Sequence, residues 1–367
     1  MKLKDITVSI FDGKHGDCKD KKGSGLYFIS VKDIKEFDID YSNAREIEEQ
    51  DFISNYQRTK LEPGDTIYAN TGDTIGKSIF VFDNPLVYKT SFQKSVAIIK
   101  PNIEFVLPRY LYYLLKYETP RLRKASTGSG QKNLLLSTMR EFEISIHSKD
   151  DQSRISHILG LIDDKIRLNN EINDNLQQLM EIFYNHYFGK LSLNDQKELF
   201  QTIKVSSLLE VKTGKEDANF SNSSGNYNFF TCSKDTLKCD TPAFFGHAIL
   251  IAGNGDFNVK HYTGDFNAYQ RTYVLIPEND LYYGSIYMSA VKLIKKFKKA
   301  SSGSIVKFIS KGDVENIQVI IPKDKSLTLQ LNDYLFSIER NLKENEELIS
   351  IRDTLLPLLM NGQATID

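Results

Sequence analysis

Residues 149–188 read KDDQSRISHILGLIDDKIRLNNEINDNLQQLMEIFYNHYF, and this stretch decides the fold. It contains one glycine, no proline, and apolar residues three and four positions apart, which is the pattern of one long amphipathic helix. Its expected core positions are Ile155, Leu159, Ile162, Ile166, Ile172, Leu176, Leu179 and Phe183. A twin stretch after Pro322 ends at Pro357 and Gly362. Its apolar positions are Leu335, Ile338, Leu342, Leu348, Ile349, Leu355, Leu356 and Leu359.

The two stretches match at an offset of 176 residues, which aligns Ile162 with Ile338 and Ile166 with Leu342. Asn169 and Asn345 then occupy matching positions, where a heptad repeat would place an apolar residue. A buried asparagine fixes the register of paired helices, so pairing of the two helices would explain both residues. The alternative is that each asparagine faces water, because a 3.6-residue period drifts away from a heptad within a few turns.

The segments before the helices are also related to each other, at an offset of about 175 residues. Residues 125–129 (ASTGS) recur as residues 300–304 (ASSGS), and Leu134 then aligns with Ile309. Further matches pair Phe142, Ile144 and Ile146 with Ile317, Val319 and Ile321, Leu111-Tyr112 with Ile286-Tyr287, Gln93-Lys94-Ser95 with Gln270-Arg271-Thr272, and Thr71-Gly72-Asp73 with Asn254-Gly255-Asp256. The alternation at residues 142–146 and 317–321 predicts a strand in each copy. The expected plan is domain, helix, domain, helix.

Composition limits the class of protein without identifying it. A chain of 367 residues is long enough for two to three folding units. Forty-seven basic and 48 acidic residues give a net charge of −1, so a nucleic-acid partner would be met by local basic patches. The start of the chain has no signal-like apolar run, and no segment is long enough to span a membrane, so a cytoplasmic protein is expected.

Cysteine usage favours the same compartment and no metal site. Three cysteines, Cys18, Cys232 and Cys239, are too few for a disulfide framework. Cys232, Cys239 and His247 do not have the spacing of zinc ligands, so no metal is expected.

Basic residues gather at the same place in both copies. Residues 109–137 contain Arg109, Lys116, Arg121, Arg123, Lys124 and Lys132 with one acid, Glu118. Residues 285–312 contain Lys292, Lys295, Lys296, Lys298, Lys299, Lys307 and Lys311 with no acid. Each patch is a predicted helix followed by a Gly-Ser loop, which suits contact with phosphates. A solvated helix face is the alternative, but recurrence in two diverged copies favours nucleic acid.

The loops after these helices keep their frame while the side chains differ. Copy one offers Gln131, Lys132 and Asn133, and copy two offers Val306, Lys307 and Phe308. This pattern suits two domains of one architecture that read two different sequences. Gly-bearing turns supply weaker candidates that could be ordinary turn formers: Asn70, Thr71, Lys77, Asn254, Asn258 and Lys260.

No catalytic signature stands out. Asp83-Asn84-Pro85-Leu86 only approaches an amino-methyltransferase motif, and there is no phosphate-binding Gly-Lys-Ser/Thr loop. Two alternatives to a DNA-reading protein therefore stay open. One is a nuclease with dispersed carboxylates, and the other is a coiled-coil scaffold without a DNA role.

In its motifs and their order, the chain resembles the specificity subunit of Type I DNA restriction-modification systems over essentially its whole length. The stretches that carry the resemblance are residues 10–16 (IFDGKHG), 61–67 (LEPGDTI), 72–76 (GDTIG), 110–115 (YLYYLL), 128–134 (GSGQKNL) and 355–362 (LLPLLMNG). Copy two departs from the family pattern: residues 327–330 (LTLQ) stand where copy one has Gln152 and Ile155.

The resemblance implies an α+β fold: two related mixed α/β target recognition domains joined by two long helices that pair as an antiparallel coiled coil. The expected boundaries are residues 1–148 for the first domain, 149–189 for the first spacer helix, 190–322 for the second domain, and 323–367 for the second helix and tail. Each domain would read half of a bipartite site in double-stranded DNA.

The resemblance further implies that this chain is not itself an enzyme and binds no cofactor. Its helices would set the spacing of the half-sites and dock two modification subunits, which carry S-adenosylmethionine and the adenine methylation chemistry. Restriction subunits, using ATP and Mg²⁺, would join for cleavage, and no membrane partner is implied.

Two sets of candidate residues follow from the repeats and the resemblance. The candidate DNA-binding residues are Lys14, His15, Asn70, Thr71, Lys77, Arg121, Arg123, Lys124, Gln131, Lys132, Asn133, Lys215, Asn254, Lys260, Gln270, Lys292, Lys295, Lys296, Lys298, Lys299 and Lys307. The candidate coiled-coil and docking residues are Ile155, Ile162, Ile166, Asn169, Leu176, Leu179, Phe183, Leu335, Ile338, Leu342, Asn345, Leu355 and Leu359.

Overall fold

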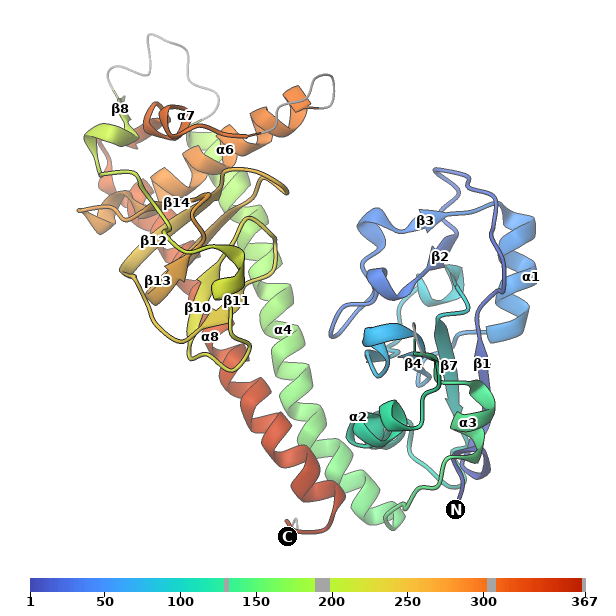
Figure 1. Ribbon diagram of the computed structural model, residues 1–367. Helices are drawn as coiled ribbons and strands as arrows, with labels where there is room; N and C mark the ends of the chain where they lie inside the picture. Colours follow the sequence, from blue (N-terminus) through green and yellow to red (C-terminus); the bar gives the residue numbers. More distant parts are fainter. Residues whose placement is uncertain (129–131, 189–198, 302–307, 365–367) are drawn as a thin grey trace. The chain divides into compact units, whose positions relative to one another are not determined.

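The computed structural model describes residues 1–128, 132–188, 199–301 and 308–364. Two compact units divide the chain, and each contains one part of both long helices. Unit 1 comprises Met1–Arg167 and Glu346–Asp367, and unit 2 comprises Leu168–Asn345. The mixed helices and strands of both units confirm the α+β fold class (Figure 1). Within the described ranges, no helix has the length and apolar character needed to cross a membrane.

Unit 1 is built on two small sheets. The first is antiparallel with strand order β1-β7-β4-β5, from β1 (Thr7–Asp12), β7 (Val96–Pro101), β4 (Thr66–Ala69) and β5 (Ser78–Phe80). The second has the order β3-β2-β6, from β3 (Arg45–Glu46), β2 (Tyr27–Ile29) and β6 (Thr90–Phe92). All four residues of β4 are buried, as expected for a central strand with both faces covered.

The helices of unit 1 pack on its two sheets and include the C-terminal helix of the chain. They are α1 (Glu49–Thr59), α2 (Pro108–Lys124), α3 (Leu136–Glu141) and the outer parts of α4 (Lys149–Phe188) and α8 (Lys325–Met360). Helix α2 begins at Pro108, whose fixed φ suits the first helical position. Leu356 and Leu359 of α8 share one buried cluster with Leu3 and with Leu159 of α4. Residues from both ends of the chain therefore build the core of unit 1.

Unit 2 contains a six-stranded sheet and a two-stranded sheet. The order of the larger is β11-β10-β13-β12-β14-β9, from β11 (Leu237–Cys239), β10 (Tyr227–Phe230), β13 (Val259–Ala268), β12 (Phe244–Ala252), β14 (Thr272–Leu275) and β9 (Lys212–Thr213). Strands β15 (Gln318–Pro322) and β8 (Phe200–Lys204) pair antiparallel. The predicted strand at 317–321 is therefore present, whereas its counterpart at 142–146 makes only a bridge between Glu143 and Lys2.

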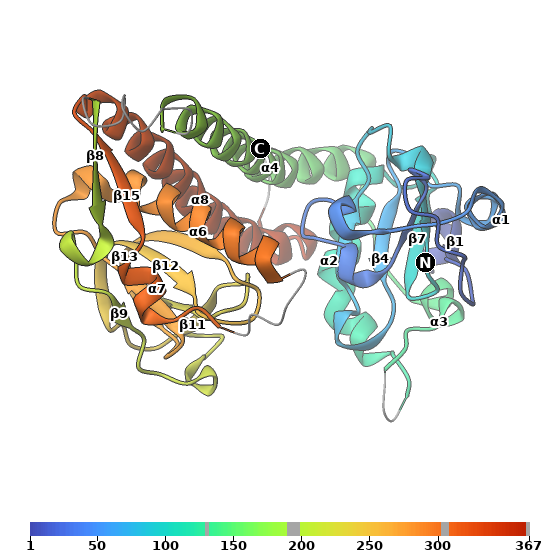
Figure 2. The same ribbon diagram turned by 90° about the horizontal axis from the view of Figure 1, so that it is seen from above.

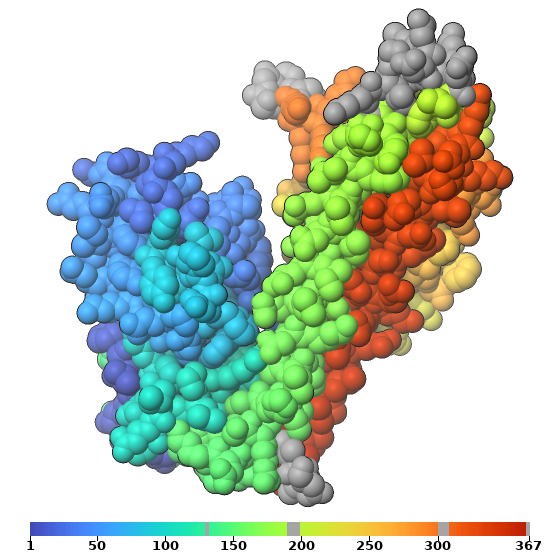
Figure 3. Space-filling model, turned by 180° about the vertical axis from the view of Figure 1, so that it is seen from behind, coloured from blue at the N-terminus to red at the C-terminus, as the bar shows by residue number. Residues whose placement is uncertain are grey.

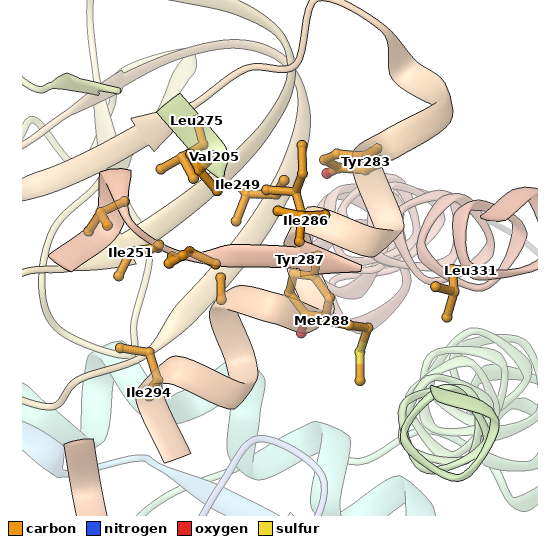
Figure 4. Packing of buried hydrophobic residues seen from close by; sticks show 14 of the residues in the cluster. Val205, Ile249, Ile251, Leu275, Tyr283, Ile286, Tyr287, Met288, Ile294 and Leu331 are labelled. Atoms are coloured by element: carbon orange, nitrogen blue, oxygen red, sulfur yellow. The ribbon is translucent and has the colours of Figure 1, made fainter. Parts of the chain in front are cut away.

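Helix α6 (Tyr283–Ser301) lies between the larger sheet and α8 (Figure 2), and α7 (Lys311–Glu315) precedes β15. Figure 4 shows the buried cluster in which Ile286 of α6 packs near Ile249 and Ile251 of β12. Leu331 of α8 belongs to the same cluster. Short 3-10 helices complete both units: Leu3–Asp5, Val31–Asp33, Tyr41–Asn43, Gly72–Thr74, Val87–Lys89, Val205–Ser207, Ala218–Phe220 and Asp280–Tyr282.

Both long helices have recognisable ends. The Ser148 hydroxyl accepts a hydrogen bond from the Asp151 backbone N–H (3.2 Å), and Asp150 and Asp151 in the first turn favour the positive end of the α4 dipole. Helix α8 continues past Pro357 to Met360, and Gly362 follows with a φ of +72°. The helix therefore ends between Pro357 and Gly362, the two residues predicted to mark its end.

The duplication predicted from the sequence is visible in backbone hydrogen bonds. In unit 1 the Leu3 N–H donates to Phe142 O (2.9 Å), and in unit 2 the Val205 N–H donates to Ile317 O (3.0 Å). Phe142 and Ile317 are the residues that the 175-residue offset aligned. The two units therefore share one backbone plan.

Candidate nucleic-acid interface and helix pair

Three segments meet at the end of β4 in unit 1, around Asn70, Ser95 and Leu134, and we call this arrangement the frame. The Asn70 N–H donates to Ser95 O in the β6–β7 turn (3.1 Å), and the Leu134 N–H donates to Asn70 O (2.8 Å). Thr127 and Asn133 exchange two backbone hydrogen bonds, so residues 132–134 are held beside the end of α2. Asn70 itself is 3% exposed. Asn70, a predicted DNA contact, is therefore buried where the three segments meet, and its backbone joins the other two segments.

The same three segments meet in unit 2 with the same bonds. The Gly253 N–H donates to Arg271 O in the β13–β14 turn (2.9 Å), and the Ile309 N–H donates to Gly253 O (2.7 Å). Gly72 and Gly255, which the repeat aligned, have φ values of +68° and +69°. The sequence match of Gln93-Lys94-Ser95 was one residue out of register, because the bonds make Ser95 equivalent to Arg271.

A close backbone crossing recurs beside this frame. A Cβ on Gly13 would lie 1.9 Å from Phe92 O, and a Cβ on Gly214 would lie 1.9 Å from Ala268 O. Only glycine fits either place. Lys14 and Lys215 follow these glycines directly, and Lys215 is exposed. The Lys14 ammonium instead lies 2.5 Å from Asp51, and His15 Nε2 lies 2.8 Å from Asp12.

The exposed side chains on the two frames differ in chemistry. Lys94, Lys132 and Asn133 are exposed in unit 1. Gln270, Arg271 and Phe308 are exposed at the corresponding places in unit 2. Lys94 and Arg271 were missed by the sequence reasoning, although a turn between two strands of each repeat was a signal for them. Gln131 and Lys307 lie outside the described residues.

The basic residues of α2 are mostly engaged within unit 1. Arg121 pairs with Glu118 (2.7 Å) and lies over the Phe142 ring, and Arg123 donates to Ile75 O (2.7 Å). Arg109 forms a bidentate pair with Asp164 of α4. Lys124 is exposed at the end of the helix. Arg109, Arg121 and Arg123 of this patch therefore also hold α2 within unit 1.

The lysines of α6 form the more exposed patch. Lys292, Lys295, Lys296, Lys298 and Lys299 are all exposed. Lys295 pairs with Glu181 of α4 at 2.7 Å. The exposed lysines run along the helix, whose last turn carries Lys298 and Lys299. This face suits sequence-independent contact with phosphates.

The weaker turn candidates are half-buried. The Thr71 hydroxyl lies 3.4 Å from Asn133 Oδ1, and Lys77 uses its carbonyl to accept from the Ala69 N–H. Asn254 sits next to the frame residue Gly253. Lys260 lies against the Phe230 ring, 3.3 Å from Asp235 O, and burial lowers its pKa to about 8. Lys260 is therefore turned toward the sheet of unit 2.

Helices α4 and α8 pair along a buried seam whose centre is polar. The Asn169 amide donates to Asn345 Oδ1 (2.8 Å), and the Asn345 amide donates to Asn170 Oδ1 (2.9 Å). One turn away, the Asn341 amide donates to Asn173 Oδ1 (2.8 Å). Asn169 and Asn345 are 1% and 6% exposed. Pairing, and not exposure to water, is therefore the correct interpretation of these two asparagines.

The predicted apolar positions are buried at the start of α4, whereas further along α4 the buried face lies one residue beyond them. Ile155, Ile166, Leu335 and Ile338 are buried, and Leu359 packs in unit 1. Ile162, Leu176, Phe183 and Leu355 are half-buried. Ile172, Leu179 and Leu342, expected in the core, are exposed, while Asn173, Met180, Tyr184 and Phe188 are buried in α4. The buried face follows the 3.6-residue period, which carries it one residue beyond the apolar positions.

Each unit also holds an acid of low exposure on a long helix, with the Asp163 side chain 6% exposed and the Glu339 side chain 12% exposed. Asp163 of α4 accepts from the Tyr113 hydroxyl (2.8 Å) and pairs with Arg352 of α8 (3.0 Å). Glu339 of α8 accepts from the Tyr283 hydroxyl (2.7 Å) and pairs with His261 (2.8 Å). Asp163 and Glu339 are equivalent at the helix offset of 176. The sequence reasoning missed both acids, although that offset aligns them.

In unit 2, residues 327–330 stand where copy one has Gln152, and another side-chain amide makes the corresponding contacts. The Asn332 side chain accepts from the Gly284 N–H (2.8 Å) and donates to Asp280 O (2.8 Å). In unit 1, Gln152 accepts from the Leu107 N–H (2.8 Å) and donates to Phe105 O (3.1 Å). An amide near the start of each long helix therefore anchors the backbone around the first turn of α2 or α6.

An exposed apolar stripe runs along α4 within unit 2. It consists of Leu168, Ile172, Leu179 and Ile182, which are 50%, 38%, 49% and 65% exposed. Figure 3 shows this part of α4, in yellow-green, beside α8 in red. Aligned exposed apolar side chains of this kind mark interaction surfaces.

The three cysteines are buried and free. Cys232 Sγ donates to Arg271 O (3.3 Å), and Cys239 Sγ to Thr241 O (3.5 Å). No group of three or more His, Cys, Asp or Glu side chains that could hold a metal occurs among the residues the structure covers.

Comparison with known proteins agrees with this geometry. The family described as Type I restriction modification DNA specificity domain matches residues 11–178 and 197–348. The EcoDI specificity subunit of Escherichia coli is 36% identical over 187 residues, which are 48% of this chain and 40% of that protein. The MjaIX specificity subunit of Methanocaldococcus jannaschii is 24% identical over all of this chain and 93% of its own length.

A crystal structure of a Type I restriction-modification S subunit from M. genitalium has a similar fold. It aligns with a TM-score of 0.58 at 16% identity and covers 100% of this chain and 96% of its own. This chain spans less than half of the E. coli relative. The two matched ranges contain the two repeats, and the chain belongs to the family of Type I restriction modification DNA specificity domains.

Proposed function

We propose that this chain is the non-catalytic DNA specificity subunit of a Type I restriction-modification complex, and that each unit reads one half of a bipartite site. The observation that carries this proposal is the duplicated frame. Asn70 and Gly253 make the same two backbone hydrogen bonds, while the exposed side chains on the frames differ. Equal frames with unequal side chains are what two readers of unequal sequences require.

The α6 lysines supply the second element of DNA binding. A row of exposed ammonium groups next to the unit 2 frame would neutralise phosphates and position the duplex without reading its sequence. In unit 1, exposed Lys94, Lys124 and Lys132 would serve the same purpose. Family membership supports DNA as the partner.

The chemistry would reside in partner subunits. Modification subunits would bring S-adenosylmethionine for adenine methylation, and restriction subunits would bring ATP- and Mg²⁺-dependent cleavage. The apolar stripe of Leu168, Ile172, Leu179 and Ile182 on α4 is the surface we assign to a modification subunit. Burying this stripe would remove apolar area from water and favour a stable complex.

The proposal is tested by mapping methylated adenines in cells that contain the modification subunit with and without this chain. Sequence-specific methylation at a two-part site should require the chain. Purified chain incubated with DNA and Mg²⁺ should leave the DNA uncut. Cleavage by the chain alone would favour a nuclease, and salt-independent, negligible DNA binding would favour a scaffold.

The docking surface needs its own test. The double substitution Leu179→Glu and Ile182→Glu should abolish co-purification with the modification subunit, because it places two charges in the apolar contact. Asn185→Glu adds a charge at an exposed polar position of the same helix and should leave the complex intact. Equal loss with both variants, or with neither, would remove the stripe from the interface.

A further inference from the structure

The turn between β13 and β14 holds its three residues rigidly. The Tyr269 N–H donates to Phe230 O (2.9 Å), and the Gln270 N–H donates to Glu216 O (2.8 Å). Arg271 O accepts from the Gly253 N–H (2.9 Å) and from Cys232 Sγ (3.3 Å). The backbone of the turn is therefore tied to a separate segment at each position.

The side chain on this rigid backbone is that of Arg271. Arg271 is exposed, and within the described part of the chain no hydrogen bond or ion pair engages its guanidinium. Most other arginines here are engaged, as Arg45, Arg58, Arg109, Arg121, Arg123, Arg140 and Arg352 show. A guanidinium carried by a fixed stretch of backbone can place two parallel donors against the O6 and N7 acceptors of guanine.

The equivalent turn of unit 1 makes the same backbone hydrogen bonds but carries a different side chain at the position of Arg271. The Gln93 N–H donates to Ile29 O (2.9 Å), the Lys94 N–H donates to Lys14 O (3.2 Å), and Ser95 O accepts from the Asn70 N–H (3.1 Å). Ser95 therefore stands where unit 2 has Arg271, and its short hydroxyl cannot make a two-pronged contact. A residue needed only for the fold would not have to be so different between the two copies.

We propose that Arg271 is a base-reading side chain of unit 2 and that it recognises a guanine in the half-site of that unit. This inference rests on the proposed function. It assigns sequence reading in unit 2 to the β13–β14 turn, and phosphate contact to the α6 lysines. Because Ser95 replaces the guanidinium, the half-site of unit 1 would lack this contact.

The test uses the full chain in complex with the modification subunit and measures binding to a library of half-site variants, together with adenine methylation in cells. Arg271→Lys keeps the charge but loses the planar pair of donors. It should lose roughly 5- to 150-fold discrimination at one G·C pair of one half-site. Lys298→Ala is the matched control, and it should weaken all sequences alike.

The outcomes separate this inference from the proposed function. If Arg271→Lys behaves as the unsubstituted chain while Arg271→Ala weakens every sequence equally, Arg271 contacts a phosphate and the inference is wrong. If neither variant changes binding or specificity, the inference is also wrong. In both cases the unsubstituted chain would still direct methylation to a two-part site, whereas failure of the proposed function would abolish that targeting itself.

Discussion

The ion pair between Asp163 and Arg352 allows a quantitative test of how α4 and α8 are held together in unit 1. The two side chains are 6% and 4% exposed, and Arg352 Nη1 lies 3.0 Å from Asp163 Oδ1. The Arg352 guanidinium also contacts Glu36 and Asp353, both at 3.0 Å. These two acids are about half exposed, so water solvates them when the arginine is removed, whereas Asp163 would stay buried.

Removing one partner of a buried pair strands the other charge and costs about 3–5 kcal/mol. We expect Arg352→Met to lower the free energy of unfolding of unit 1 by that amount, because Asp163 would lose its ion pair and, among the described residues, keep a hydrogen bond from the Tyr113 hydroxyl alone. Asp163→Asn should cost less, because Arg352 keeps two carboxylates. The double substitution Asp163→Leu and Arg352→Leu should recover most of the loss, because no charge is then buried.

Denaturant unfolding followed by circular dichroism measures these differences, and Lys295→Met is the control. The Lys295–Glu181 pair has side chains 57% and 44% exposed, so its loss should cost at most about 1 kcal/mol. The reasoning fails if Arg352→Met costs no more than Lys295→Met. It fails equally if the double variant is as unstable as Arg352→Met, because the cost would then come from lost packing.

Three further predictions concern the seam, the basic patch and a buried lysine. Asn169→Leu alone should cost about 1–3 kcal/mol of stability because the buried Asn345 Oδ1 loses its hydrogen-bond donor, and adding Asn345→Leu should restore it, as thermal unfolding will show. In DNA titrations at several salt concentrations, Lys296→Ala with Lys298→Ala should make the slope of log binding constant against log salt concentration shallower by about one unit per lost contact. Lys295→Ala should leave this slope unchanged, because the Lys295 ammonium pairs with Glu181. Burial lowers the pKa of Lys260 to about 8, so the unfolded chain binds more protons between that pH and 10.5. Stability should therefore rise with pH across this window, and Lys260→Met should remove that rise in unfolding measured at pH 7.5 and 10; an unchanged profile would place Lys260 in water.

The sequence by itself determined the plan of the molecule. The spacing of apolar residues at 149–188 predicts one long helix, because helical periodicity is a property of neighbouring residues. The self-match at about 175 residues places Leu134 opposite Ile309, and a separate match nearer the start of each copy, at a larger offset, places Gly72 opposite Gly255. The paired asparagines Asn169 and Asn345 were also visible as polar exceptions in that pattern.

Only the tertiary structure decided which side chains are engaged. Arg121 and Arg123 read as part of a basic patch, but their partners Glu118 and Ile75 are fixed by how α2 packs on unit 1. Lys94 and Arg271 became candidates only when backbone hydrogen bonds corrected the register of the repeat by one residue.

The same limit applies to the helix pair. Arg352 meets Asp163 across 189 residues of chain, and no local pattern specifies such a partner. The seam shifts from Leu179 to Met180 because a straight helix turns its buried face with a period of 3.6 residues, whatever the order of its apolar residues. Periodicity fixes which elements form, whereas burial and charge pairing depend on which elements meet in space.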